Sequence, residues 1–207
     1  DDQRRHRNVG HGVEFGNHNV IADDRARAAA LSGLLKEEPQ FVFEAHSTDY
    51  QGARKLRELV EDGFPILKVG PELTFVLREA LYGLDHVASE LVEGYDRALA
   101  RTMERLMLAD PANWDRHYAG TAHEQRLLRH FSLSDRIRYY WTNGEALTAV
   151  ETLFAALRGR AVPLPLLSQY IPHAACFAGQ PLAPEEIVMH YVTRSLAAYH
   201  AACFPAP

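Results

Sequence analysis

The chain has 207 residues, of which 47% are hydrophobic and 24% are charged. This composition is typical of an ordinary globular protein, and the length suits one domain or somewhat more. The formal net charge of −5 gives no electrostatic reason to expect nucleic acid or an anionic membrane as a partner, and no apolar run approaches the roughly 20 residues that a membrane-spanning helix needs.

The cysteines and the first residues bear on the cellular compartment. Cys176 and Cys203 are too few for a disulfide framework and lack the spacing of a zinc finger. We therefore expect reduced thiols packed in the core of a cytoplasmic protein. No signal segment begins the chain, and its start, "DDQRRHRNVGHGVEF", lacks an initiator methionine, as we expect of a fragment or a trimmed chain.

The first 92 residues alternate between strand-like and helix-like segments. Short runs rich in valine and aromatic residues predict strands, and segments with apolar residues at helical spacing predict helices. The predicted order is strand 8–15, helix 22–38, strand 41–46, helix 53–62, strand 65–70 and helix 72–92. Such alternation predicts an α/β fold in which helices connect parallel strands, either a barrel or a doubly wound sheet.

The ends of the helix over 53–62 carry their own signals. Thr48 or Asp49 is the expected N-cap, and Gly63 is a suitable C-terminal stop. After residue 92 the strand signals fade, and helical patterns cover 95–110, 122–131, 144–159 and 184–204. The proline-bracketed segment "LPLLSQYIP" (164–172) is expected to be irregular.

The second predicted strand ends in ionisable side chains. Alternate residues of a strand share a face, so Glu44 and His46 point the same way, and Asp49 follows in the next loop. Ligands of parallel α/β folds gather at the carboxyl ends of strands. Polar groups in that position need a partner, a ligand or a metal.

The other two predicted strands place polar residues at the same end. Glu14 and Asn19 belong to the end of the first strand, and Lys68 belongs to the third. Carboxylate, imidazole and ammonium groups from three strand ends that meet at one mouth are typical of a sugar or sugar-phosphate site. The alternative is an inter-strand ion pair, with His46 as a satisfied core histidine.

A second polar cluster lies in "SLSDRIRYYW" (132–141). Ser134, Arg136 and Arg138 combine a hydroxyl with guanidinium groups, which suit phosphate through bidentate hydrogen bonds. The alternative is a solvated helix start capped by Ser134. Gln169, between the prolines of "PLPLLSQYIP", is a further polar candidate. The chain has no GxxxxGK[ST] string, so a P-loop kinase is not supported.

Several long strings resemble one known family. "FEAHSTDYQ", "ILKVGPELTFVLREAL", "SLSDRIRYYW" and "PLPLLSQYIP" are similar to the non-catalytic, Z-type subunit of class II D-tagatose-1,6-bisphosphate aldolase. The resemblance implies a (β/α)8 TIM barrel of which this chain is the C-terminal half. Residues 1–92 would then hold the last three βα units, and 93–207 a helical extension on the same barrel.

The resemblance also implies a function. The family's role is to stabilise the zinc-carrying catalytic aldolase subunit in the cytoplasmic breakdown of galactitol and N-acetylgalactosamine, with a phosphorylated ketohexose as the ligand. Some members are associated instead with ketohexose 4-epimerisation by retro-aldol chemistry, and a binding module without chemistry is a third reading.

Residue roles follow from either activity. Glu44 or Asp49 is the candidate base, and His46 is a metal ligand if a divalent metal such as zinc binds. Lys68, Arg136 and Arg138 are expected to hold phosphate. The remaining candidates for substrate binding are Glu14, Asn19, Ser134 and Gln169.

Overall fold

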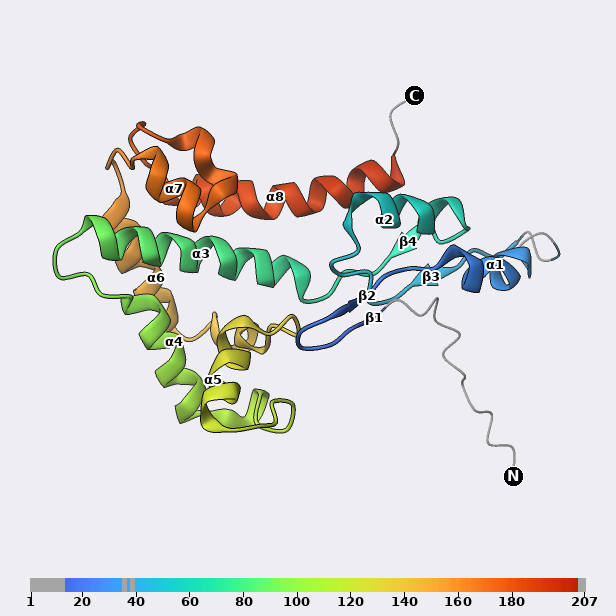
Figure 1. Cartoon of the computed structure of the whole chain (residues 1–207), viewed down its shortest axis with the longest axis horizontal. Helices are drawn as coiled ribbons and strands as arrows, with labels where there is room; N and C mark the ends of the chain where they lie inside the picture. The colour runs from blue at the N-terminus through green and yellow to red at the C-terminus, as the bar shows by residue number, and fades with distance from the viewer. Residues whose placement is uncertain (1–13, 35–36, 38–39, 205–207) are drawn as a thin grey trace. The chain divides into compact units, whose positions relative to one another are not determined.

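The first described element is an antiparallel hairpin of β1 (Glu14–Phe15) and β2 (Val20–Ile21) (Figure 1). The computed structural model describes residues 14–34, 37 and 40–204. The Gly16 amide closes the hairpin turn by donating to the Asn19 carbonyl at 2.8 Å. Most of the strand predicted over 8–15 lies outside the described residues, and no sequence pattern predicts β2.

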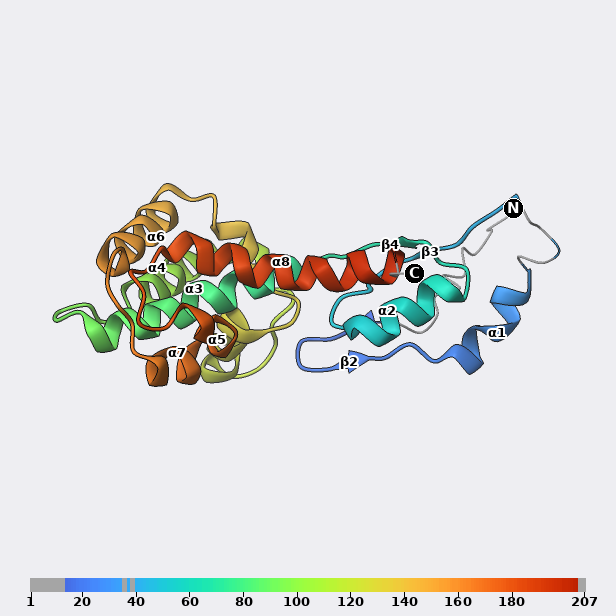
Figure 2. The ribbon, with the colours of Figure 1, turned by 90° about the horizontal axis from the view of Figure 1, so that it is seen from above.

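A parallel pair of strands follows the hairpin and α1 (Arg25–Leu34). The pair consists of β3 (Glu44–Ala45) and β4 (Ile66–Leu67), which are connected by α2 (Gly52–Glu61). Figure 1 and Figure 2 show α2 running beside this pair. The predicted connection of parallel strands by a helix is therefore confirmed.

A small apolar cluster holds the parallel pair against α2. Leu59 of α2 is buried with Ala45 and Phe64, and the rings of Phe64 and Phe43 stack with centroids 4.9 Å apart. The residues that face α2 alternate with those that do not, as the pleat of a strand requires.

The two ends of α2 differ in how well the sequence predicts them. Gly63 ends the helix with a φ of 98°, as expected. The expected N-cap is wrong: Gln51 occupies that position and its side chain makes no capping bond. Its carboxamide instead accepts from the Asp23 amide at 2.9 Å and donates to the Ile21 carbonyl at 3.0 Å.

The remaining elements are helical. They are α3 (Glu72–Leu91), α4 (Ala98–Ala109), η1 (Pro111–Asn113), α5 (Ala122–Phe131), η2 (Arg136–Tyr140), α6 (Gly144–Leu157), α7 (Leu164–Tyr170), η3 (Pro172–Phe177) and α8 (Pro184–Cys203). The helices expected over 72–92, 95–110, 122–131, 144–159 and 184–204 are confirmed. The segment expected to be irregular contains α7.

The large apolar core belongs to these helices. α3 packs against α4, α6 and α7, and its Leu84 and Val87 are fully buried with Met103 of α4 and Leu153 of α6. α3 is buried on most of its middle turns, which suits the central helix of a bundle. Among the cysteines, Cys176 is exposed and Cys203 half-buried, so the expected core position is wrong for Cys176.

By their contacts the residues form two units. One comprises the chain up to Gly70 together with the residues from Ala197 onward, and the other comprises Pro71–Leu196. The described structure is thus α/β with mostly helical content and four short strands in two separate pairs. None of the described helices combines the length and the apolar character needed to cross a membrane.

Candidate functional site

The parallel pair in the first unit presents ionisable side chains on the face away from α2. Glu44 and His46 lie on one side of β3, and the intervening Ala45 is buried against α2. Lys68 lies one residue beyond the paired Ala45 and Leu67. The predicted common face of Glu44 and His46 is therefore confirmed.

We call Glu44, His46 and Lys68 the strand-end cluster. The Lys68 ammonium and the His46 Nε2 each lie 2.6 Å from the same carboxylate oxygen, Oε1 of Glu44. The hydrogen bond from Lys68, followed by that from His46, outweighs partial desolvation and lowers the pKa of Glu44 below its usual value near 4.5. Glu44 is therefore an ionised, acceptor-only group at neutral pH.

Asp49 has a different environment. It is buried, and its Oδ1 accepts the Gly70 amide at 2.8 Å. Next to it, the buried Thr48 donates its hydroxyl to the Lys68 carbonyl at 2.9 Å. These two side chains join the loop after β3 to the loop after β4, and so position Lys68 beside Glu44.

The loop after β3 is held in an unusual backbone conformation. Ser47 has a φ of 57° and Tyr50 a φ of 63°, values that residues other than glycine adopt at a cost of order 1–3 kcal/mol. Surrounding contacts hold this conformation. The Tyr50 ring meets the Phe15 ring edge-on at 5.5 Å, and the Tyr199 hydroxyl donates to the Thr48 carbonyl at 3.1 Å.

Sequence reasoning missed Thr48 and Tyr199 as parts of this site. The sequence predicts Thr48 only as a possible helix cap, and Tyr199 lies 151 residues from Thr48, so no local pattern connects the two. Glu14 and Asn19 are exposed on the hairpin. Neither is hydrogen-bonded to the strand-end cluster in the described structure.

The second unit holds the predicted serine and arginines in one turn. The Ser134 hydroxyl lies 2.9 Å from that of Ser132 and 3.3 Å from that of Tyr118. Arg136 donates to the Asn113 carbonyl at 2.9 Å, and Arg138 donates to the Asp135 carbonyl at 3.1 Å.

Carbonyls, unlike carboxylates, leave the charge of a guanidinium uncompensated. In the part of the chain that the structure describes, neither Arg136 nor Arg138 forms an ion pair, so both remain attractive to an anion. The alternative of a helix start capped by Ser134 is wrong, since Asp135 precedes η2 with a φ of 45° and no side-chain cap forms. Gln169 is exposed on α7.

The sequence also gave no signal for the ion pair beneath this turn. The Arg78 Nε of α3 donates to the Asp135 Oδ1 at 2.8 Å, and both side chains are buried. The Arg78 guanidinium also lies 4.3 Å from the centroid of the Phe75 ring.

The described residues do not form a metal site by themselves. A catalytic zinc takes three protein ligands, and Glu44 and His46 supply two at most. Over 14–34, 37 and 40–204 no group of three His, Cys, Asp or Glu side chains is arranged to hold a metal ion. The metal-ligand role of His46 stays a prediction.

Comparison with known proteins identifies the family. Residues 8–204 match the model of a family described as D-tagatose-1,6-bisphosphate aldolase subunit GatZ/KbaZ-like. The chain belongs to this family. The resemblance of the sequence strings to this family is thereby confirmed.

Two relatives of the family are similar over nearly the whole chain. A D-tagatose 6-phosphate 4-epimerase from Agrobacterium fabrum is 56% identical over 192 residues, which are 92% of this chain and 45% of that protein. A crystal structure of a probable tagatose 6 phosphate kinase from Sinorhizobium meliloti 1021 is 51% identical, with a TM-score of 0.87.

The crystal structure match covers 94% of this chain and 51% of that chain. The present chain thus spans about half the length of the relatives it matches. These names together connect the family to tagatose-related sugar-phosphate metabolism.

Proposed function

We propose that the protein containing this chain epimerises carbon 4 of a phosphorylated ketohexose, with the strand-end cluster in its active site. The observation that carries this proposal is the single carboxylate oxygen of Glu44 shared by Lys68 and His46 on an open face of the strand pair. The 56% identity to a D-tagatose 6-phosphate 4-epimerase supports the choice of reaction.

The reaction needs carbon–carbon bond cleavage. In a 2-ketohexose, carbon 4 is two bonds from the carbonyl carbon, so its C–H bond is not acidified. A base that takes the proton of the carbon 4 hydroxyl allows the bond between carbons 3 and 4 to break. The electron pair moves to the enediolate of carbons 1–3, and carbon 4 becomes an aldehyde.

Rotation of that aldehyde followed by re-addition inverts carbon 4. The enediolate carbon attacks the opposite face of the aldehyde, and the base returns its proton to the new alkoxide. Atoms and electrons balance without an oxidant. The same first step, with release of the two fragments, is aldol cleavage.

The geometry suggests which residue performs each step. Glu44 is ionised and exposed, so it is the proposed base. Its lowered pKa makes it a weak base while Lys68 is bound, and transfer of Lys68 to an oxygen of the substrate would raise that pKa again. In this proposal Lys68 stabilises the enediolate oxygen, His46 orients Glu44, and the buried Asp49 is a positioning residue.

The phosphate and the hydroxyls of the substrate need further groups. The phosphate-binding roles expected for Arg136 and Arg138 and the hydroxyl contact expected for Ser134, all residues of the second unit, stay predictions. Glu14 and Asn19 are exposed in the same unit as the strand-end cluster and remain candidate hydroxyl ligands. The role expected for Gln169 stays a prediction.

The strand pair supports a barrel as the architecture around this site. The face covered by α2 is apolar, while the opposite face carries the exposed Val42 and Ile66 and then the strand-end cluster. An apolar layer below polar groups at the carboxyl ends of strands is the arrangement inside a TIM barrel. We therefore propose that β3 and β4 are part of such a barrel.

A second candidate function rests on the family description. That description names an aldolase subunit, so the protein would support a catalytic class II aldolase subunit and keep a sugar-phosphate pocket. In this case the strand-end cluster would bind the ligand, and its loss would leave stabilisation of the partner intact.

The test uses the full-length protein that contains this chain, purified without any aldolase subunit. We expect NMR spectra of D-tagatose 6-phosphate to show its 4-epimer forming over time. Glu44→Gln should lower the rate roughly 10²–10⁴-fold, since it removes the base without changing shape. Lys55→Met is the matched control, because Lys55 pairs with Glu58 on α2 at 2.8 Å, outside the cluster.

The outcomes separate the two functions. In one outcome, the wild-type protein shows no turnover alone but makes cleavage of D-tagatose 1,6-bisphosphate faster or longer-lived when an aldolase subunit is added. This result would contradict the epimerase proposal and favour the supporting-subunit function. If Glu44→Gln leaves the turnover rate unchanged, the strand-end cluster takes no part in the reaction.

A further inference from the structure

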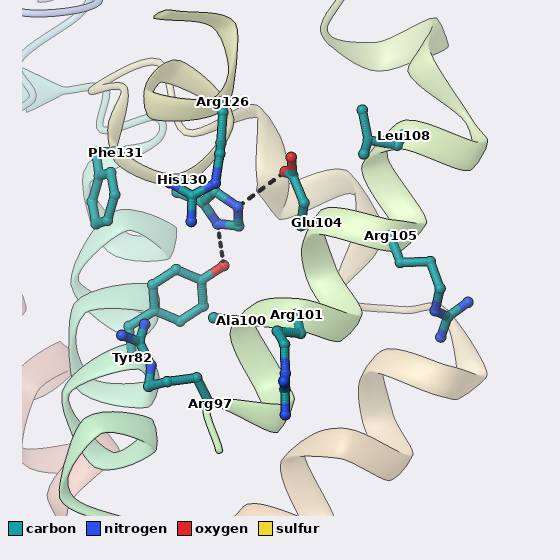
Figure 3. Close-up of a pocket in the computed structure, with 10 residues that line it drawn as sticks. All are labelled: Tyr82, Arg97, Ala100, Arg101, Glu104, Arg105, Leu108, Arg126, His130 and Phe131. Atoms are coloured by element: carbon teal, nitrogen blue, oxygen red, sulfur yellow. Dashed lines mark hydrogen bonds and ion pairs between the residues drawn. The ribbon is translucent and has the colours of Figure 1, made fainter. Parts of the chain in front are cut away.

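The second unit contains a cavity that the proposed chemistry does not use. It has a volume of about 550 Å³ and is lined by side chains of α3, α4 and α5 together with Arg97 (Figure 3). The cationic lining residues are Arg97, Arg101, Arg105 and Arg126. A cavity of this size suits a small molecule rather than a polymer.

The carboxylate in the lining is already neutralised. Both oxygens of Glu104 are bound by Arg129, at 2.9 Å and 2.5 Å, and Oε2 also lies 3.0 Å from the His130 Nε2. Arg129 is buried and does not line the cavity. The negative charge of Glu104 therefore offers little repulsion to an anion in the cavity.

The wall around Glu104 is a fixed chain of hydrogen bonds. His130 contacts Glu104 through Nε2 and the Tyr82 hydroxyl through Nδ1, at 2.7 Å. Because Glu104 is an acceptor, the neutral imidazole donates from Nε2 and accepts from Tyr82. Figure 3 shows these three side chains in a row, with Arg126 on one side and Arg101 on the other.

Several arginines of the lining are held weakly or not at all. Arg101 pairs with Asp96 at 2.8 Å, but their side chains are 64% and 74% exposed, and such surface pairs contribute about 0–1 kcal/mol. The pair of Arg105 with Glu145 is similarly exposed. Within the described residues, Arg126 makes no hydrogen bond or ion pair. These guanidinium groups can bind a ligand at little cost.

We propose that this cavity binds a small, multiply phosphorylated metabolite. Arg101 and Arg126 bind its phosphate groups by charge-assisted hydrogen bonds, to which the planar guanidinium is suited. The exposed side chains of Leu108 and Phe131 in the lining contact its carbon skeleton. The inference concerns binding alone, so it can fail while the proposed epimerase activity holds.

The test measures binding to the full-length protein by calorimetry. The probes are fructose 1,6-bisphosphate, pyrophosphate and inorganic phosphate. We expect the bisphosphate to bind more tightly than inorganic phosphate, and the affinity to fall with added salt. Arg126→Gln and Arg101→Gln should each weaken binding of the bisphosphate roughly tenfold or more.

Arg116→Gln is the matched control, since Arg116 is exposed in the same unit and does not line the cavity. Thermal melts without ligand verify that each variant folds. The absence of binding by any probe would overturn the proposal. Equal loss of affinity in Arg116→Gln and Arg126→Gln, or no loss in the two cavity variants, would do the same. Equal affinity for the bisphosphate and inorganic phosphate would mean that the cavity binds phosphate without recognising a metabolite, which would also overturn the proposal.

Discussion

At the scale of single residues, the pair of Arg78 and Asp135 places two opposite charges almost wholly out of solvent. Their side chains are 3% and 0% exposed, and one described hydrogen bond of 2.8 Å joins them. Removal of one charge from such a pair leaves the other buried without compensation. The pair connects α3 to the turn that carries Arg136 and Arg138.

We therefore expect Asp135→Asn to lower the free energy of unfolding by about 3–5 kcal/mol. Asparagine keeps the size of the side chain and tolerates the positive φ of this position, so the charge is what changes. Urea denaturation measures the effect. The control, Asp96→Asn, breaks an exposed pair and should cost no more than about 1 kcal/mol. Comparable losses in both variants would contradict the argument.

At the scale of elements, the contact of α3 with α7 and the residues after it depends on a glycine. A Cβ at Gly83 would lie 1.9 Å from the Cγ2 of Ile171 and 2.8 Å from the Tyr170 carbonyl oxygen. Helices pack this closely only where a side chain is absent. The backbone oxygen cannot move aside as a flexible side chain would.

Gly83→Ala should therefore destabilise the protein by about 1–3 kcal/mol, although alanine is the better helix former by about 1 kcal/mol. Thermal melts of the variant check this sign. Gly144→Ala, at the start of α6, meets nothing within 4 Å and should be neutral or slightly stabilising. A higher melting temperature for Gly83→Ala would show that α3 and the segment 170–171 separate easily.

The elements also show where sequence reasoning succeeds. Long helices such as α3 and α8 are predictable because apolar residues repeat at helical spacing over many turns. The sequence does not predict α7, because prolines commonly interrupt helices. Pro163 precedes the helix and Pro165 lies in its first turn, where the missing amide proton costs nothing. β2 was missed because two residues carry no periodicity.

At the scale of the whole molecule, the candidate site was predictable only in part. Strand alternation places Glu44 and His46 on one face, and parallel connection brings Lys68 to the same end of the pair. The contacts of Tyr199 with Thr48, and of Tyr82 with His130, join residues 151 and 48 positions apart. Such contacts are set by tertiary packing, which a local pattern does not record.

Global stability should depend on pH through one of these long-range contacts. Burial of His130 lowers its pKa from the usual value near 6.5 to about 4, against the opposing attraction of Glu104. Between these values the unfolded chain binds a proton at this side chain and the folded protein does not. Stability must therefore fall as the pH falls through this window.

Desolvation by burial is the largest single influence on Glu104 and raises its pKa, but the hydrogen bonds and charges of Arg129 and His130 together outweigh it, so the pKa is lowered. Its stabilising contribution is lost only as the pH falls below the usual value near 4.5, so the upper part of the window reports histidines. Desolvation by burial also lowers the pKa of His86 and of His173, so the contribution of His130 is the difference between the wild type and a variant at that residue. We expect His130 to contribute a slope of up to about 1.4 kcal/mol per pH unit in urea denaturation between roughly pH 6.5 and pH 4.5. His130→Gln should reduce the slope of the whole protein by this amount, whereas His123→Gln, an exposed change on the same helix, should leave it unchanged. Equal pH dependence of the free energy of unfolding in the wild type and His130→Gln would mean that the imidazole is protonated in the folded protein. The Tyr82 hydroxyl would then have no acceptor at Nδ1.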